Sequence, residues 1–128
     1  MMRLRLTATG DAAPAVAWER YRDLRLWPTW SPQVRGVDAD AHLLETGLRG
    51  AVVGPAGLRL PFEVLDVDET AMSWRWRVRA GFVDAVLDHA VRAAPRGAAT
   101  DLVVTAPSVF AVAYAPLAQL ALHRLVRG

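Results

Sequence analysis

The 128-residue sequence contains no cysteine, lysine, isoleucine or asparagine. The absence of cysteine excludes a disulfide framework, a thiolate metal site and a cysteine nucleophile, and we expect a cytoplasmic protein. The other three missing residue types have AT-rich codons, which indicates a GC-rich genome. All 15 basic residues are therefore arginines, and against 13 acidic residues they leave a net charge of only +2. So small an excess gives no reason to expect a nucleic-acid partner.

Long hydrophobic segments are also scarce. The N-terminal residues lack the apolar stretch of a signal peptide. Residues 102–122 carry no charge and are long enough to span a bilayer, but Pro107 and Pro116 interrupt them. We interpret this segment as a buried strand followed by a helix, with a membrane anchor as the less favoured alternative. Because 53% of the residues are hydrophobic and 22% charged, the chain is globular, and its length favours one domain over residues 1–128.

Alternating polar and apolar residues, typical of half-buried β-strands, dominate the sequence. The clearest case is WRWRVR, in which Trp74, Trp76 and Val78 share one face and the intervening arginines share the other. Short turns between successive strands indicate antiparallel pairing. The predicted strands cover residues 3–9, 34–40, 42–54, 58–68, 72–81, 83–95 and 100–106.

Two short helices are predicted after the first strand. Asp11 is a candidate N-cap for a helix that begins near Pro14. The next segment, residues 26–34, is predicted as a short, broken helix, because Pro28 and Pro32 disfavour helical geometry in the residues before them. Its sequence begins LWPTWSP and holds two of the five tryptophans of the chain.

A long C-terminal helix is predicted from Ser108, its N-cap, through Arg124. Phe110, Tyr114 and Leu117 recur at helical spacing on the face that we expect to meet the sheet. No other predicted element is long enough to fill the concave side of a strongly bent sheet. The sequence therefore predicts an α+β fold, in which a curved antiparallel sheet of about six to seven strands wraps around this helix.

Several pieces of the chain together are similar to one known family. They are AVAWERYRDLRLWPTWSP after the first strand, GLRGAVVGPAG, PFEVLDVDE, WRWRV, DHAV, and YAPLAQLALHRLV in the last helix. In this order they resemble the START-like (SRPBCC) ligand-binding superfamily, in particular its polyketide cyclase/dehydrase and lipid-transport branch. The resemblance covers nearly the whole chain. It implies a helix-grip fold that binds a lipid, polyketide or quinone-like molecule between sheet and helix, but it assigns no catalytic residue.

This resemblance places the LWPTWSP segment at the rim of a cavity. Trp27 and Trp30 would gate its mouth, and the alternative is that both simply pack the short helices onto the sheet. The candidates for lining the cavity are Trp30, Phe62, Trp74, Trp76, Leu87, His89, Phe110, Tyr114 and Leu117. For these aromatic residues, plain core packing is the alternative to ligand contact.

His89 occupies an inward-facing position of its predicted strand. We interpret it either as a ligand contact or general base, or as a core histidine satisfied by a neighbour. Tyr114 offers the best hydroxyl on the last helix, and it would complete an acid/base pair in an enzyme. Pro116 is expected to loosen that helix. We expect no cofactor and no metal, because His42 and His123 lie in other predicted elements.

An arginine stripe of Arg75, Arg77 and Arg79 is predicted on the outer face of the sheet. It is interpreted as a site for an anionic partner or membrane surface, or, as the favoured alternative, as cross-strand partners of acids such as Asp84 and Asp88. Three functions stay open. They are binding of a hydrophobic small molecule, a polyketide cyclase or dehydratase reaction in the same cavity, and an interaction or membrane-surface module. The oligomeric state stays open as well.

Overall fold

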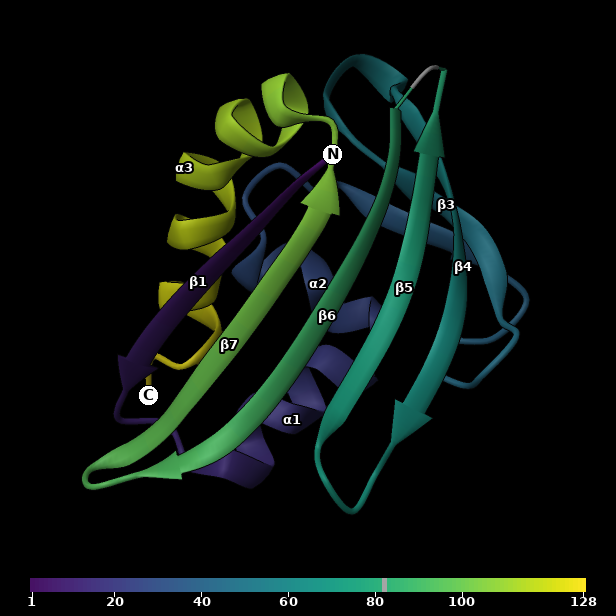
Figure 1. The fold of residues 1–128 in the computed structure, drawn as a ribbon. Coiled ribbons are helices and arrows are strands. Elements are labelled where there is room, and N and C mark those ends of the chain that lie inside the picture. Colours follow the sequence, from purple (N-terminus) through teal and green to yellow (C-terminus); the bar gives the residue numbers. More distant parts are fainter. Residues whose placement is uncertain (82) are drawn as a thin grey trace.

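The computed structural model describes residues 1–81 and 83–128. Within them, a seven-stranded sheet curves around a long C-terminal helix (Figure 1). The strands are β1 (Met2–Gly10), β2 (Gly36–Ala39), β3 (Arg49–Val53), β4 (Arg59–Asp68), β5 (Ser73–Ala80), β6 (Val83–Ala94) and β7 (Gly97–Ala106). The helices are α1 (Pro14–Arg22), α2 (Trp27–Trp30) and α3 (Ser108–Leu125), with 3-10 turns at Leu24–Leu26 and Pro55–Gly57. The predicted α+β helix-grip fold is confirmed.

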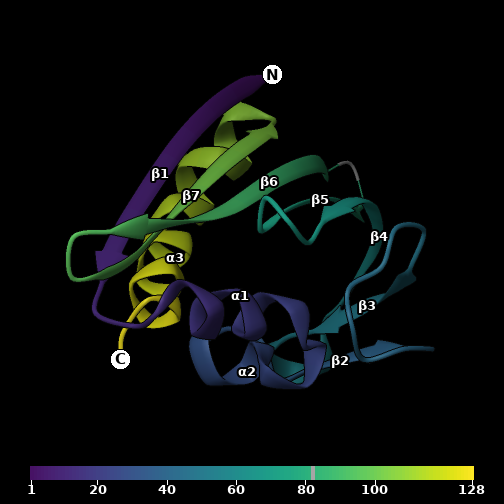
Figure 2. The same ribbon diagram turned by 90° about the horizontal axis from the view of Figure 1, so that it is seen from below.

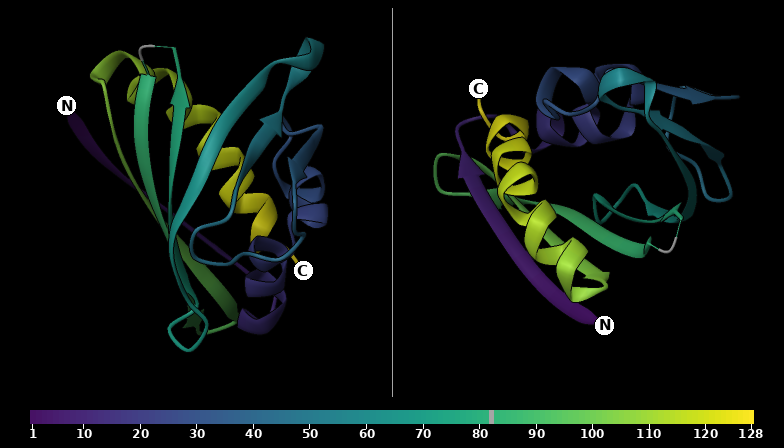
Figure 3. Two further views of the ribbon diagram at one scale, coloured as in Figure 1. Left: turned by 90° about the vertical axis from the view of Figure 1, so that its right-hand side faces the viewer. Right: turned by 90° about the horizontal axis from the view of Figure 1, so that it is seen from above.

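The sheet is an antiparallel meander whose first strand joins the last. Its order is β1-β7-β6-β5-β4-β3-β2, and β1 pairs with β7 from Met2 opposite Ala106 to Gly10 opposite Ala98. Figure 2 shows the sheet curling, with α3 beside β1 and β7. The short helices α1 and α2 lie between α3 and β2, so that sheet and helices together surround one interior (Figure 3).

Local irregularities accompany the bend of the sheet. The register of β4 on β5 shifts between Val64 and Asp66, and such a bulge bends its strand. In β3, Gly50 approaches β2 so closely that a Cβ atom there would stand 2.4 Å from the Asp38 carbonyl oxygen. Gly47, just before β3, has a φ of 91°, a conformation that glycine adopts without strain.

β2 and β3 are shorter than predicted, because residues 40–48 belong to neither strand. The backbone of this segment pairs instead with the end of α1. The Leu24 N–H donates to the His42 carbonyl at 2.7 Å, and the Leu44 N–H donates to the Arg22 carbonyl at 2.9 Å. This long-range pairing satisfies backbone groups that the alternation had assigned to the sheet.

Both predicted helix caps are wrong. Ala13 occupies the cap position of α1 and makes no side-chain cap, while the Asp11 carboxylate accepts the Gly128 N–H at 2.6 Å. Asp11 therefore joins the end of β1 to the C-terminus. At α3 the cap position belongs to Pro107, and Ser108 is the first helical residue. The fixed φ of proline pre-sets this extended entry into the helix.

The uncharged run at residues 102–122 divides between β7 and α3. The interpretation as a strand followed by a helix is therefore confirmed. Throughout the described part of the chain, no helix has both the length and the apolar character that a membrane crossing requires.

The arginine stripe pairs with acids of the neighbouring strand β6. Arg75 contacts Asp88 at 2.5 Å, and Arg77 contacts Asp84 at 2.6 Å. Arg79 lies 3.7 Å from the same Asp84 carboxylate. The favoured cross-strand interpretation is thus confirmed, and these partners neutralise most of the positive charge that the stripe presents.

Candidate functional site

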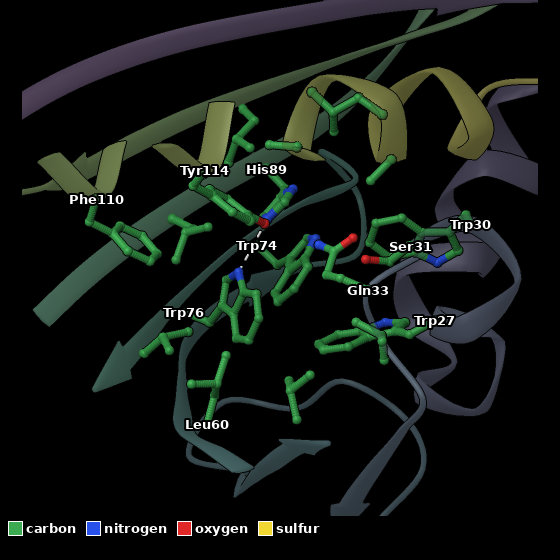
Figure 4. Close-up of a pocket in the computed structure, with 18 residues that line it drawn as sticks. Trp27, Trp30, Ser31, Gln33, Leu60, Trp74, Trp76, His89, Phe110 and Tyr114 are labelled. Carbon is green, nitrogen blue, oxygen red and sulfur yellow. Dashed lines mark hydrogen bonds between the residues drawn. The ribbon is translucent and has the colours of Figure 1, made fainter. Parts of the chain in front are cut away.

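A cavity of about 90 Å³ lies between the inner face of the sheet, α2 and α3 (Figure 4). Seven of the predicted candidates line it, namely Trp30, Trp74, Trp76, Leu87, His89, Phe110 and Tyr114. The wall also contains Trp27, Ser31, Gln33, Val34, Val52, Leu60, Val78, Leu102, Ala118, Ala121 and Leu122. Most of these side chains are apolar or aromatic, as expected for a site that holds a hydrophobic molecule.

Two predicted residues lie outside the cavity wall. Phe62 is buried, but it packs against Trp27 and Trp76, with ring centroids 6.2 and 5.6 Å apart. Leu117 is 45% exposed. The face of α3 that meets the sheet contains Ala118, whose small side chain lets the helix approach closely, and this orientation turns Leu117 outward.

Some of the unpredicted wall residues carried a signal in the sequence. Val78 follows the same inward alternation as the predicted tryptophans of β5, and Leu60 follows that of Phe62 in β4, so period-two reasoning extends to both. Gln33 and Ser31 follow α2 in a segment without periodicity. Their position on the wall depends on how α2 packs, and no local pattern indicates it.

Trp27 and Trp30 hold α2 against the end of α1. The Trp27 Nε1–H donates to the Tyr21 carbonyl at 2.9 Å, and the Trp30 Nε1–H donates to the Arg20 carbonyl at 2.8 Å. Both indoles are buried, and their rings form part of the cavity wall. Packing accounts for both residues, and a gating role stays a prediction.

His89 belongs to a chain of directed hydrogen bonds. The Trp76 Nε1–H donates to His89 Nε2 at 3.1 Å. Because Nε2 accepts, a neutral imidazole carries its proton on Nδ1. The Nδ1–H then donates to the Tyr21 hydroxyl oxygen at 3.2 Å, so both ring nitrogens of His89 are occupied.

The Thr100 end of this hydrogen-bond chain requires the same order of donors and acceptors. The Thr100 hydroxyl donates to the Ala90 carbonyl at 3.0 Å, so its oxygen is free to accept from Tyr21. The Tyr21 hydroxyl donates to Thr100 Oγ1 at 2.6 Å, and its own oxygen therefore accepts from His89. Both ends require the same tautomer, and each polar group in the chain is satisfied.

Burial keeps the titratable groups of this wall neutral. It lowers the pKa of His89 to about 3 and raises the pKa of Tyr114 to about 12. The pKa of Tyr21 is also raised, chiefly by burial. A neutral histidine with both nitrogens bonded accepts a proton only by breaking its bond to Trp76. The geometry therefore supports the core-histidine interpretation over that of a general base.

The whole chain, residues 1–128, matches the family model described as polyketide cyclase / dehydrase and lipid transport. The chain belongs to this family. The match agrees with the START-like resemblance of the sequence. No curated protein shows significant similarity to the chain.

Solved structures share the fold of this polyketide cyclase/dehydrase family member. The di-domain ARO/CYC BexL from the BE-7585A biosynthetic pathway superposes with a TM-score of 0.82 at 13% identity, over 98% of this chain and 45% of BexL. MLL2253 from Mesorhizobium loti gives a TM-score of 0.79 at 14% identity, over 97% of this chain and 96% of that protein. Ara h 8.0201 gives 0.70 at 13% identity, over 97% of each chain. Identities this low establish the fold alone.

The buried hydrogen-bond chain makes one testable contribution to the stability of this family member. Tyr21→Phe removes the acceptor of the His89 Nδ1–H, and the other tautomer would place an Nε2–H against the Trp76 N–H. We expect the free energy of unfolding to fall by about 1–3 kcal/mol, the cost of an unpaired buried group. Urea titration followed by tryptophan fluorescence measures this change.

Tyr114→Phe is the matched control, because the Tyr114 hydroxyl is not part of the hydrogen-bond chain formed by Tyr21, Thr100 and His89. It should leave the free energy of unfolding nearly unchanged. Equal losses in the two variants would contradict the hydrogen-bond chain.

Proposed function

We propose that this protein binds a hydrophobic small molecule in the cavity between the sheet, α2 and α3. The observation that carries this proposal is the composition of the wall, where aromatic and aliphatic side chains surround an interior space. Binding there removes the apolar surface of a ligand from water, which is favourable without any specific partner. The lipid-transport and polyketide wording of the family description supports the same ligand class.

The size of the cavity limits what enters without movement. Its volume of about 90 Å³ is below the roughly 300–1,000 Å³ of pockets that enclose drug-sized ligands. A lipid or polycyclic ligand therefore has to widen it. Pro116 lies inside α3, where it removes one backbone hydrogen bond. We expect α3 to be the wall that shifts.

The alternative of a cyclase or dehydratase reaction receives less support from the geometry. Its base candidate, His89, has both nitrogens bonded and a lowered pKa. The hydroxyl of Tyr114 stays protonated because burial raises its pKa, so it acts as a donor to a ligand rather than as a base. The third alternative, a module that uses the arginine stripe, is weakened by the acidic partners of all three arginines.

Filling the cavity tests the proposed function. Ala118→Leu extends a side chain from α3 into the space that a ligand would occupy. Toluene, titrated into ¹⁵N-labelled protein and followed by chemical-shift changes, should bind the wild type at least tenfold more tightly than this variant, because the added methyl groups occupy its volume. Native mass spectrometry of the purified protein should show a co-purified apolar molecule that Ala118→Leu reduces.

Ala113→Leu makes the same change at an exposed position of the same helix, so it separates a cavity effect from an effect on the helix. It should bind toluene as the wild type does. Toluene binding that is unchanged in Ala118→Leu, or absent in the wild type, would refute the proposal. If Ala118→Leu does not fold, the smaller change Ala121→Val at another wall residue provides the same comparison.

A further inference from the structure

Trp74 differs from the other four tryptophans in its indole N–H group. The N–H groups of Trp18, Trp27, Trp30 and Trp76 all donate to acceptors at 2.7 to 3.1 Å. Trp74 Nε1 has no hydrogen-bond partner among the described residues, although the side chain is only 2% exposed. Buried donors are nearly always paired, and an unpaired one requires an explanation.

A second buried polar atom without a partner lies on the same cavity wall. It is Oε1 of Gln33, an acceptor, and no further buried side-chain nitrogen or oxygen of the described residues lacks a partner. Gln33 and Trp74 both line the cavity. Figure 4 shows them extending into it from different elements, Trp74 from β5 and Gln33 from the segment after α2. One unpaired donor and one unpaired acceptor therefore belong to one apolar cavity.

We propose that the ligand carries a hydroxyl group that these two side chains hold. Its oxygen accepts the Trp74 Nε1–H, and its proton is donated to Gln33 Oε1. A hydroxyl is a single small group that both donates and accepts, whereas a carbonyl or ether oxygen would satisfy Trp74 only. This inference rests on the proposed function and adds the polar group that orients the ligand.

The side chains around Trp74 favour a ligand in which that hydroxyl group is attached to an aromatic ring. Trp74 stacks on His89, with ring centroids 4.6 Å apart and an interplanar angle of 10°, and on Trp76 at 5.3 Å and 29°. Phe110 and Tyr114, also stacked, add a second flat surface from α3. Flat rings pack favourably between such surfaces.

Because an apolar cavity of roughly 150 Å³ accepts benzene, a space of about 90 Å³ suits one ring with modest widening. The ligand class is therefore a phenol, alone or as the leading ring of a larger molecule.

Phenol and toluene test this inference because they differ by a hydroxyl in place of a methyl group. Their affinities are measured by ¹H–¹⁵N spectra that resolve the tryptophan indole groups, with the Trp74 cross-peak assigned from its loss in Trp74→Phe. Phenol should shift that cross-peak downfield, as hydrogen bonding does. The ratio of phenol affinity to toluene affinity should fall roughly tenfold in Trp74→Phe and also in Gln33→Met, since each variant removes one hydrogen bond to the hydroxyl.

Trp18→Phe is the matched control, because it makes the same substitution at a tryptophan that bonds Glu69 and lies outside the cavity. It should keep the wild-type affinity ratio. Gln33→Met changes a residue outside the sheet, so it keeps the test valid if Trp74→Phe does not fold.

Two outcomes overturn the inference, and they differ in what they say about the proposed function. If both compounds bind and their affinity ratio is the same in wild type, Trp74→Phe and Gln33→Met, the hydroxyl site fails while the apolar cavity function stands. A Gln33 amide turned so that its oxygen accepts the Trp74 N–H directly would explain that result. If neither compound binds the wild type, the cavity function and the hydroxyl site fail together.

Discussion

Acidification from pH 6.5 to pH 4.5 is expected to lower the free energy of unfolding by about 2 kcal/mol through His89 alone. The unfolded chain has a histidine pKa near the ordinary value of 6.5, whereas the folded pKa is about 3. Between these values the unfolded state binds a proton that the folded state excludes, at about 1.4 kcal/mol per pH unit. The contribution of His89 to stability is therefore complete well above pH 6.5, and it is lost progressively as the pH falls from 6.5 towards 3. Urea titrations at a series of pH values measure the slope.

The surroundings of His89 offer no route by which the folded state could accept this proton. Its contacts are Trp76, Tyr21 and the stacked ring of Trp74, and none of them carries a negative charge. Tyr114, on the same cavity wall, is neutral as well. A proton on Nε2 would also face the Trp76 N–H, so two donors would meet. Burial, without a charged partner, lowers the pKa.

Two controls isolate the contribution of His89. His123→Gln, at an exposed histidine, should leave the slope between pH 6.5 and 4.5 unchanged, and His89→Asn should flatten it. Asp84, whose pKa a hydrogen bond from Arg77 lowers, titrates below this window. An independent check is the imidazole ¹³C shift of His89, which should stay that of the neutral ring at pH 4.5. A protonated His89 in the folded protein at that pH would contradict the assignment.

Strand alternation predicted much of this site because its period is a property of the backbone. Trp74, Trp76, Leu87 and His89 all line the cavity, since side chains two residues apart along a strand share a face. The helical spacing that placed Phe110 and Tyr114 was less accurate at Leu117. A helix has no fixed face until its neighbours are known, and the small alanines, rather than the large side chains, determine how close α3 lies.

The role of His89 could not be predicted from the sequence. Its position on the inward face was predictable, but its partner Tyr21 lies 68 residues away on another element. No local pattern shows that Thr100 and Ala90 continue the same hydrogen-bond chain. The same limit applies to Gln33, because only tertiary packing shows that it shares a cavity with Trp74. In each case the fold alone does not tell whether the residue is structural or functional. The polar partner of the residue has to be known as well.

Trp27→Ala is expected to lower the free energy of unfolding by about 3–5 kcal/mol, as large-to-small changes at buried tryptophans do. The side chain is 2% exposed and contacts Trp74 and Trp76, with ring centroids 5.5 and 5.2 Å apart. Its loss also leaves the Tyr21 carbonyl without the indole donor. Since small domains have about 5–15 kcal/mol of stability in total, urea titration should show a variant that folds but is marginal.

Added ligand separates packing from gating at this residue. If Trp27 is a packing residue, Trp27→Ala joins a new void to the existing cavity, and toluene that fills it stabilises the folded state by mass action. Saturating toluene should then raise the Tm of Trp27→Ala by more than it raises the wild-type Tm, while Trp27→Phe lies between the two. If Trp27 is instead a gate, Trp27→Ala should lose little stability. Toluene should then exchange faster than in the wild type, while its affinity stays the same. Because the Trp27 indole donates a hydrogen bond to the last turn of α1 and its ring packs against Trp74 and Trp76 in the wall, we expect the packing result. On that result the LWPTWSP segment would be a fixed wall of the cavity, and α3 would be the element that we propose to open.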